Sequence, residues 1–162
     1  ETNMIKNYDF EAYMPKTSSP YALEGRYYVP LYWSWEDSNE RYVESLEYAD
    51  LTRDYHSGSY SWKHSRGEGR GERTITSDLV YLEKGEYKFS IWTKSNVISS
   101  GSNIKFYLSD EYLGVVDFEN SWDDFVTTVD MDEGEYVLTI VIKDNTEDSV
   151  DVYLDDISLE LV

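Results

Sequence analysis

The strongest constraint on the fold is an alternation of apolar and polar residues through the second half of the chain. In residues 86–94, Tyr87, Phe89 and Ile91 alternate with Lys88 and Ser90. Residues 103–109 and 135–143 repeat this pattern, and glycine-containing turn sequences precede residues 86 and 135. A period of two places successive side chains on opposite faces of a strand. The pattern therefore predicts antiparallel hairpins and gives helix almost no support.

Further strands complete the predicted fold. Residues 121–131 carry Phe125 and Val129 on one face, and shorter strands are expected at 42–48, 59–65 and 73–82. Residues 12–30 contain all three prolines and are expected to form loops with at most one short strand. About nine to eleven short strands in one domain of this length are typical of a sandwich. We predict a single all-β module over residues 1–162, a two-sheet antiparallel β-sandwich of the jelly-roll type.

The last strand changes register along its length. Its apolar residues occupy even positions as far as Leu154 and odd positions from Ile157 onward. A regular strand cannot change parity, so one extra residue must be absorbed between them. The sequence therefore predicts a β-bulge at Asp155-Asp156, which either holds two carboxylates for a purpose or forms a kinked surface corner.

Composition excludes several function classes. The 162 residues include 33 acidic and 14 basic side chains, a net charge of −19, which opposes binding to nucleic acids and to anionic membranes. Absence of cysteine excludes disulfides, thiolate metal sites and cysteine nucleophiles. No apolar run approaches membrane-spanning length, and two histidines give little material for a catalytic triad. The outward positions of the predicted strands show no facing pair of acids, so we expect no enzyme activity.

Several segments follow the order of a known family. Residues 3–11 are Asn-Met-Ile-Lys-Asn-Tyr-Asp-Phe-Glu, and residues 57–63 are Ser-Gly-Ser-Tyr-Ser-Trp-Lys. Residues 84–94 are Lys-Gly-Glu-Tyr-Lys-Phe-Ser-Ile-Trp-Thr-Lys, and residues 152–159 are Val-Tyr-Leu-Asp-Asp-Ile-Ser-Leu. With Ser-Trp-Asp-Asp-Phe at residues 121–125, these segments resemble the β-sandwich carbohydrate-binding modules of families four, nine and twenty-two. The resemblance implies polysaccharide binding without bond cleavage, in a module appended to a catalytic domain.

Outward aromatic residues are the candidate ligand-binding groups, because rings stack on the C–H face of a sugar while polar groups bond its hydroxyls. The strand register points Trp92, Tyr107 and Tyr153 outward, with Lys94 and Lys105 beside them. The open alternative for each ring is that a loop covers it.

Other aromatic residues divide between core and surface. Of Trp33 and Trp35, one is expected to close the core, and the other either forms a wall of the binding site or also belongs to the core. Four aromatic residues are expected in the core, namely Trp62, Trp122, Tyr87 and Tyr136.

Carboxylates near the two chain ends suggest a metal site. If the first and last strands pair, Asp9 and Glu11 lie near Asp155 and Asp156, and such a concentration of negative charge needs a counterion. Hard cations such as Ca²⁺ bind carboxylate and carbonyl oxygens. The resemblance implies a structural calcium at this position, with carbonyls from the Gly58 region. The alternative is a set of solvated acids at strand ends.

Two charge patterns remain open. No basic residue lies between Lys105 and Lys143, which indicates a solvated acidic face and disfavours uronic-acid polymers as ligands. Five basic residues lie close together in the sequence, Lys63, His64, Arg66, Arg70 and Arg73. They form either a hairpin tip or a grip for an anionic glycan.

We therefore expect a noncatalytic module that binds a β-glucan, xylan or mannan and targets an attached enzyme, in a secreted or cell-surface bacterial protein. The alternatives are a protein-interaction or adhesion sandwich of a bacterial surface or phage-tail protein and, less favoured, a small jelly-roll glycosidase or lyase.

Overall fold

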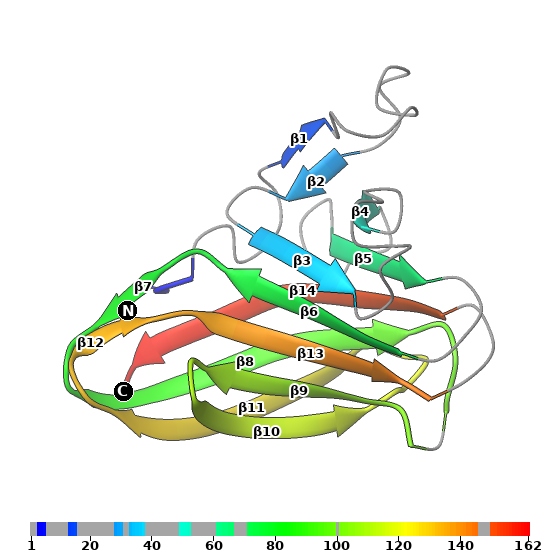
Figure 1. Cartoon of the computed structure of the whole chain (residues 1–162). Helices are drawn as coiled ribbons and strands as arrows, with labels where there is room; N and C mark the ends of the chain where they lie inside the picture. Colours follow the sequence, from blue (N-terminus) through cyan, green and yellow to red (C-terminus); the bar gives the residue numbers. More distant parts are fainter. Residues whose placement is uncertain are drawn as a thin grey trace.

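The computed structural model of the chain describes residues 3–5, 13–15, 28–30, 33–37, 49–52, 61–66, 71–99, 101–145 and 150–162. These residues form strands and turns, arranged in two five-stranded antiparallel sheets and two short ribbons (Figure 1). The predicted all-β sandwich is confirmed. No helix long and apolar enough to cross a membrane occurs in the described ranges.

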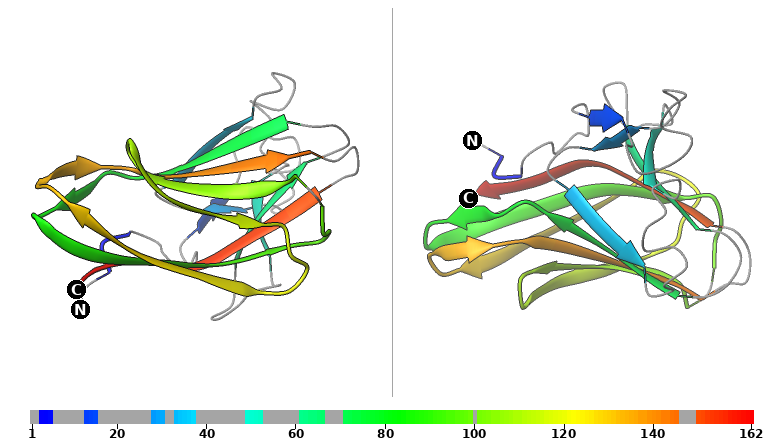
Figure 2. Two further views of the ribbon diagram at one scale, coloured as in Figure 1. Left: turned by 90° about the horizontal axis from the view of Figure 1, so that it is seen from below. Right: turned by 45° about the horizontal axis from the view of Figure 1, so that its top comes forward.

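The two sheets lie face to face (Figure 2). Sheet I has the strand order β10 (Glu111–Asp117), β9 (Asn103–Leu108), β13 (Leu138–Asp144), β6 (Gly71–Ser77) and β3 (Trp33–Asp37). Sheet II has the order β11 (Asp123–Met131), β8 (Gly85–Ser95), β14 (Val150–Leu161), β5 (Ser61–Arg66) and β4 (Ala49–Thr52). The ribbons pair β1 (Tyr13–Pro15) with β2 (Tyr28–Pro30) and β12 (Gly134–Tyr136) with β7 (Val80–Leu82).

The core lies between the sheets, where the alternating apolar residues meet. Phe89 of β8 and Phe106 of β9 are fully buried, with ring centroids 5.5 Å apart across the sandwich. Phe125 of β11 stacks on Phe106 at 5.2 Å. Tyr87 is also buried, as predicted, and Tyr136 is half-buried against the core. Aromatic contacts therefore join three strands and both sheets.

Two predicted strands are each broken in the structure. The segment expected at 73–82 forms β6 and β7, and the segment expected at 135–143 forms β12 and β13. At the break, the backbone N–H of Leu138 donates to the Ser77 hydroxyl at 2.9 Å, and the N–H of Val137 donates to the Ser109 hydroxyl at 3.2 Å. Because serine oxygens replace carbonyl acceptors here, the chain leaves sheet I without losing hydrogen bonds.

The predicted bulge in the last strand is present. The pairing of β14 with β8 shifts register between Asp155 and Ser158, and Asp156 has a φ of 48°. Asp is one of the few residues other than glycine that adopts this left-handed conformation readily. The shift lets both Leu154 and Ile157 face the core.

The two ends of the chain meet at β14. The backbone N–H of Met4 donates to the Leu159 carbonyl at 2.9 Å, and the Asn3 side chain bonds both the Ile157 carbonyl and the Leu159 N–H. The strand expected at 59–65 is observed from Ser61 as β5, whereas the one expected at 42–48 lies outside the described residues.

Candidate functional site

The structure separates the predicted ligand-binding residues onto the two outer faces of the sandwich. Tyr107 and Lys105 of β9 point outward from sheet I, because the residues that alternate with them are buried. Trp92 and Lys94 of β8 and Tyr153 of β14 point outward from sheet II. The predicted residues therefore form two candidate surfaces, separated by the thickness of the core.

The first surface, which we call the tyrosine face, is the outer face of sheet I around Tyr107 and Tyr112. These residues lie directly opposite each other on β9 and β10, with ring centroids 5.4 Å apart and planes inclined at 52°. Tyr112 is 50% exposed on the edge strand. The sequence pattern does not single out Tyr112, but the turn at Ser109-Asp110 pairs the two tyrosines once β9 and β10 are recognised as a hairpin.

Hydroxyl groups extend the tyrosine face across the sheet. Thr139 of β13 lies opposite Tyr107, and Thr76 of β6 lies opposite Thr139. Both threonines are partly exposed, as is Tyr107. The row therefore begins with two aromatic rings at the sheet edge and continues with hydroxyls toward its centre.

Charged residues on the tyrosine face are mixed in sign. Lys105 lies opposite Val141, and Lys143, two residues further along the same strand, lies opposite Glu72 and Asn103. Lys105 and Lys143, which lie at the two ends of the stretch without basic residues, are thus neighbours on one face. Glu72 and Asp117 provide opposite charges on the same face. The described outward positions of sheet I therefore carry both signs of charge, and the exposed Asp110 and Glu111 add negative charge at the hairpin end beside Tyr112.

The second surface is the Trp122 cluster, which comprises Trp122, Lys94 and Tyr153 on the outer side of sheet II. The Lys94 ammonium lies 5.2 Å from the Tyr153 ring centroid and 6.0 Å from that of Trp122. The two rings meet edge to face, with centroids 6.3 Å apart. All three side chains are partly exposed. This arrangement combines a cation–π contact with two aromatic rings at the surface.

The expectation that Trp122 lies in the core is wrong. Trp122 precedes β11, in which Asp123 lies opposite Thr93. Continuing that pairing by one residue places Trp122 beside Lys94, which points outward. The parity of the sequence contains this information, because Trp122 is three positions from the inward Phe125 and therefore faces the other way.

Trp92 lies in the row next to the Trp122 cluster. Its strand neighbours are Asp124 on β11 and Asp155 on β14. Trp92 is half-buried, and Asp155 beside it is completely buried although its register is outward. This part of the outer face of sheet II is therefore covered.

Of the tryptophans of β3 and β5, the structure describes the side chain of Trp33. Trp33 is 8% exposed and belongs to the hydrophobic core, as expected of one member of the Trp33/Trp35 pair, so it is not a ligand-binding residue. The backbone of Trp35 pairs with Ile75, and its side chain lies outside the described part of the structure. The side chain of Trp62, expected in the core, also lies outside that part.

The predicted metal ligands are described only in part. Asp9 and Glu11 lie outside the described residues. Asp155 is fully buried in the β14 bulge, and its Oδ1 accepts a hydrogen bond from the Asp156 N–H at 2.9 Å. Asp156 is partly exposed. Within the described ranges, no group of three or more acidic or histidine residues is arranged to hold a metal.

The basic segment at residues 63–73 does not place all its charges at the surface. Arg73 faces inward from β6 and is completely buried, which contradicts its assignment to a surface patch. Asp144 of the adjacent strand β13 is 2% exposed and lies on the same inner face. Two opposite charges therefore lie inside this end of the sandwich.

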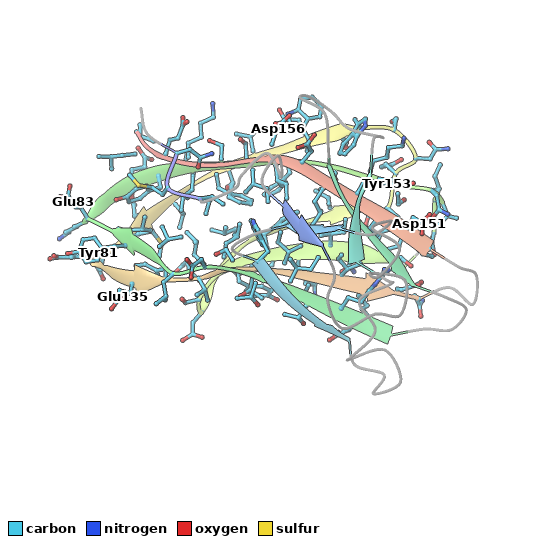
Figure 3. All side chains as sticks on the ribbon, turned by 90° about the horizontal axis from the view of Figure 1, so that it is seen from above. Tyr81, Glu83, Glu135, Asp151, Tyr153 and Asp156 are labelled. Carbon is cyan, nitrogen blue, oxygen red and sulfur yellow. The ribbon has the colours of Figure 1, made fainter. Side chains whose placement is uncertain are left out.

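The end of the molecule formed by β7 and β12 is acidic. Figure 3 shows Tyr81, Glu83 and Glu135 there, far from Tyr153. The Tyr81 hydroxyl donates to Glu133, and this bond, with smaller contributions from desolvation and the nearby glutamates, raises the pKa of Tyr81 above its usual value of 10.0. A pocket of about 310 Å³ nearby is lined by Lys84, Gly85, Glu86, Asp130, Met131 and Asp132. It lies outside both aromatic surfaces.

Neither a protein-family model nor a curated protein matches the sequence. Solved structures do match the fold. TmCBM61, solved in complex with β-1,4-galactotriose, covers 100% of both chains with a TM-score of 0.68 and 16% identity. A family 4 carbohydrate-binding module covers 98% of this chain and 99% of its own, with a TM-score of 0.55 and 15% identity. The fold is that of the β-sandwich carbohydrate-binding modules.

The same sandwich also occurs within a larger protein of another kind. The enzymatically active domain of tailspike protein 4 from bacteriophage CBA120 matches 99% of this chain with a TM-score of 0.64 and 8% identity. This chain covers only 21% of that structure. At such identities the likeness concerns the fold, and the function must be argued from the surfaces of this chain.

Proposed function

We propose that this domain is a noncatalytic carbohydrate-binding module whose tyrosine face binds a neutral polysaccharide of the β-glucan, xylan or mannan type. The observation that carries the proposal is the Tyr107–Tyr112 pair, which lies at the edge of sheet I beside a row of threonine hydroxyls. The fold shared with TmCBM61 supports a sugar ligand and adds β-1,4-galactan to the polymers that should be tested.

The tyrosine pair provides the apolar half of the site. A pyranose ring presents C–H groups on one side, and these pack favourably against an aromatic ring while its hydroxyls remain in contact with water or polar groups. The 52° inclination between Tyr107 and Tyr112 gives two ring surfaces of different direction. Adjacent sugar units of a twisted chain also differ in orientation, so each ring can contact one unit.

Neighbouring polar groups provide the other half. Hydroxyls of Thr139 and Thr76 donate and accept hydrogen bonds, and the Lys105 ammonium donates to sugar oxygens. The acids near this face favour a neutral chain, because a uronate polymer would encounter Glu72, Asp117 and the strong overall negative charge.

Affinity gel electrophoresis against the neutral polymers tests the proposal. The wild-type domain should be retarded by at least one polymer, and Tyr107→Ala or Tyr112→Ala should weaken binding about 30-fold, equivalent to roughly 2 kcal/mol for a hot-spot ring. Tyr81→Ala is the matched control, since Tyr81 is 57% exposed at the acidic end and should leave retardation unchanged.

Two results would contradict the proposal. If no glycan slows the migration of the wild-type domain, the domain does not bind carbohydrate and the proposal fails. If the folded Tyr107→Ala/Tyr112→Ala protein is retarded as strongly as wild type, the tyrosine face is not the binding site. Circular dichroism of each variant establishes that it folds.

We also propose that a structural Ca²⁺ is bound at the β14 bulge. Asp155 suits this role because a fully buried carboxylate needs a compensating positive charge or several donors. Asp9, Glu11 and Asp156 are the other proposed ligands. Bound calcium would neutralise these acids and tie the start of the chain to its last strand, without taking part in catalysis.

The proposed biological role is to hold an attached polysaccharide-acting enzyme on its substrate, outside a bacterial cell. A catalytic domain of that class next to this module in the full-length gene would support the role. The tailspike match favours an alternative, a structural or adhesion sandwich of a phage-tail or surface protein. Such a domain would bind a protein through its aromatic surfaces, and no glycan would retard it in the electrophoresis assay.

A further inference from the structure

The outer face of sheet II carries a row in which two aromatic rings flank a lysine, on the side of the sandwich opposite the tyrosine face. Trp122, Lys94 and Tyr153 occupy neighbouring positions on β11, β8 and β14. The next position of the row, opposite Tyr153 on β5, is Lys63. Figure 3 shows Tyr153 on β14 close to Asp151, at the end of the molecule away from Tyr81.

The two rings of this row converge over the lysine. Adjacent strands are roughly 4.8 Å apart, so the backbones of β11 and β14 are separated by about 10 Å across β8. The ring centroids of Trp122 and Tyr153 are nevertheless only 6.3 Å apart. Both side chains therefore lean toward Lys94, whose ammonium lies within 6.0 Å of each ring. The result is one continuous aromatic surface with a hydrogen-bond donor at its centre.

The charges around the row favour a neutral, hydroxyl-rich ligand. Asp124 and Asp151 lie in the flanking rows, so the cation is accompanied by carboxylates that accept hydrogen bonds from hydroxyls and repel anions. The large apolar side chains that the described residues expose do not include any member of the cluster. A surface that combines two edge-to-face rings with hydrogen-bond donors and acceptors matches the chemistry of a sugar better than that of an apolar protein partner.

We propose that the Trp122 cluster is a second carbohydrate-binding surface, so that one domain binds two neutral glycan chains on opposite faces of the sandwich. This inference rests on the proposed function of the tyrosine face. The two sheets are about 10 Å apart, and a single short oligosaccharide cannot contact both outer faces. The two surfaces therefore bind separate chains and link them.

Trp92 lies in the neighbouring row of the same face, beside the fully buried Asp155. The proposed surface therefore comprises Trp122, Lys94 and Tyr153, whose side chains are all partly exposed.

Calorimetry with a short oligosaccharide of whichever polymer retards the domain tests the inference. Wild type should bind two oligosaccharides per chain. The Tyr107→Ala/Tyr112→Ala protein and the Trp122→Ala/Tyr153→Ala protein should each bind one, with the other site weakened at least about tenfold. Wild type should also raise the light scattering of the soluble polymer by linking chains, and neither double variant should do so.

The outcomes separate this inference from the proposed function. No binding by wild type overturns both. If the wild-type chain binds one oligosaccharide and only the tyrosine-face variant loses it, the second binding surface is contradicted and the tyrosine face remains the site. Loss of all binding in the Trp122→Ala/Tyr153→Ala variant alone overturns the two-site model. Preferential retention by polygalacturonate over neutral polymers overturns the assignment of a neutral ligand.

A second measurement covers the case in which the Trp122 variant does not fold. In the Tyr107→Ala/Tyr112→Ala protein, the indole N–H resonance of Trp122, assigned with Trp122→Phe, should shift as oligosaccharide is added. A resonance that stays fixed at saturating oligosaccharide contradicts the proposal.

Discussion

The two outer faces of the sandwich are built from the same alternating pattern, but they differ in what their outward side chains contact. On sheet I, the outward side chains of β9, β13 and β6 are at least partly exposed. On sheet II, the outward register of the central strand β14 includes Asp155, which is completely buried. Outward register therefore establishes the side of a sheet on which a residue lies, and exposure depends on what else covers that side.

The bulges of the two sheets show the same contrast. In sheet I the register shift lies in the edge strand, between Tyr112 and Gly114, where the backbone approaches Phe125. In sheet II the shift lies in a strand with partners on both sides and carries two aspartates. The first bulge lies where a ring approaches the backbone and the second carries a buried carboxylate, and each can be tested by substitution.

The largest expected effect is that of Gly114→Val. Gly114 has a φ of 152°, and a Cβ atom there would lie 2.3 Å from Cζ of Phe125. The ring is packed against the core and cannot move freely, so we expect destabilisation by about 3 kcal/mol or more. Urea unfolding measures the effect.

Gly134→Ala is the matched control for this substitution. Its Cβ atom would make only an ordinary contact, 3.5 Å from the Tyr136 ring. Equal stability losses in the two variants would show that the close approach at Gly114 is not what limits the edge strand.

The bulge of sheet II is expected to respond to loss of charge. Asp155→Asn should lower stability by about 2 kcal/mol, because groups arranged around a buried carboxylate lose their partner. The wild-type melting temperature should also fall after chelation, and the variant should no longer respond to chelator. If chelation leaves the melting temperature of the wild-type protein unchanged, the protein does not depend on a bound calcium.

Asp156→Gly separates a conformational role from a ligand role at the same bulge. Glycine adopts a φ of 48° without strain, so any loss of stability in this variant comes from the missing carboxylate. Because Asp156 is a proposed calcium ligand, we expect a lower melting temperature and a weaker response to chelator. Unchanged stability and an unchanged response would show that Asp156 serves only to turn the chain.

A smaller effect should distinguish the lysines of the two faces. Lys94→Met removes the cation that contacts both Trp122 and Tyr153, and should cost about 0.5–1 kcal/mol. Lys105→Met on the tyrosine face is the control, since no ring contact with Lys105 occurs in the described ranges, and its cost should be smaller. Equal losses of stability in denaturant unfolding of the two proteins would show that the cation–π contacts contribute nothing.

The smallest effect concerns the acidic end, which belongs to neither face. The raised pKa of Tyr81 means that its hydrogen bond to Glu133 is complete below pH 10 and is lost as pH rises through the higher folded-state value. Glu133→Gln should lower that pKa toward 10. A tyrosine-selective NMR titration, assigned with Tyr81→Phe, would contradict this if the two titration curves coincided.

Period-two patterns predicted most of the local structure. They assigned Phe89 and Ile91 to the core, identified the bulge at Asp155-Asp156, and placed Trp92 and Tyr107 in outward register. They also contained the orientation of Trp122, because parity from Phe125 settles it. What they did not contain was that Trp92 and Tyr107 belong to different sheets, so that a site using both cannot exist.

The sequence by itself determined which residues alternate between core and surface, because side-chain direction along a strand depends only on neighbouring residues. The tertiary structure alone decided that Tyr107 meets Thr139, whereas Lys94 meets Trp122 and Tyr153. Those contacts join strands that are distant in the chain or belong to different hairpins. They depend on the order of the strands in each sheet. That order is selected by the packing of the whole core, and no local sequence pattern encodes it.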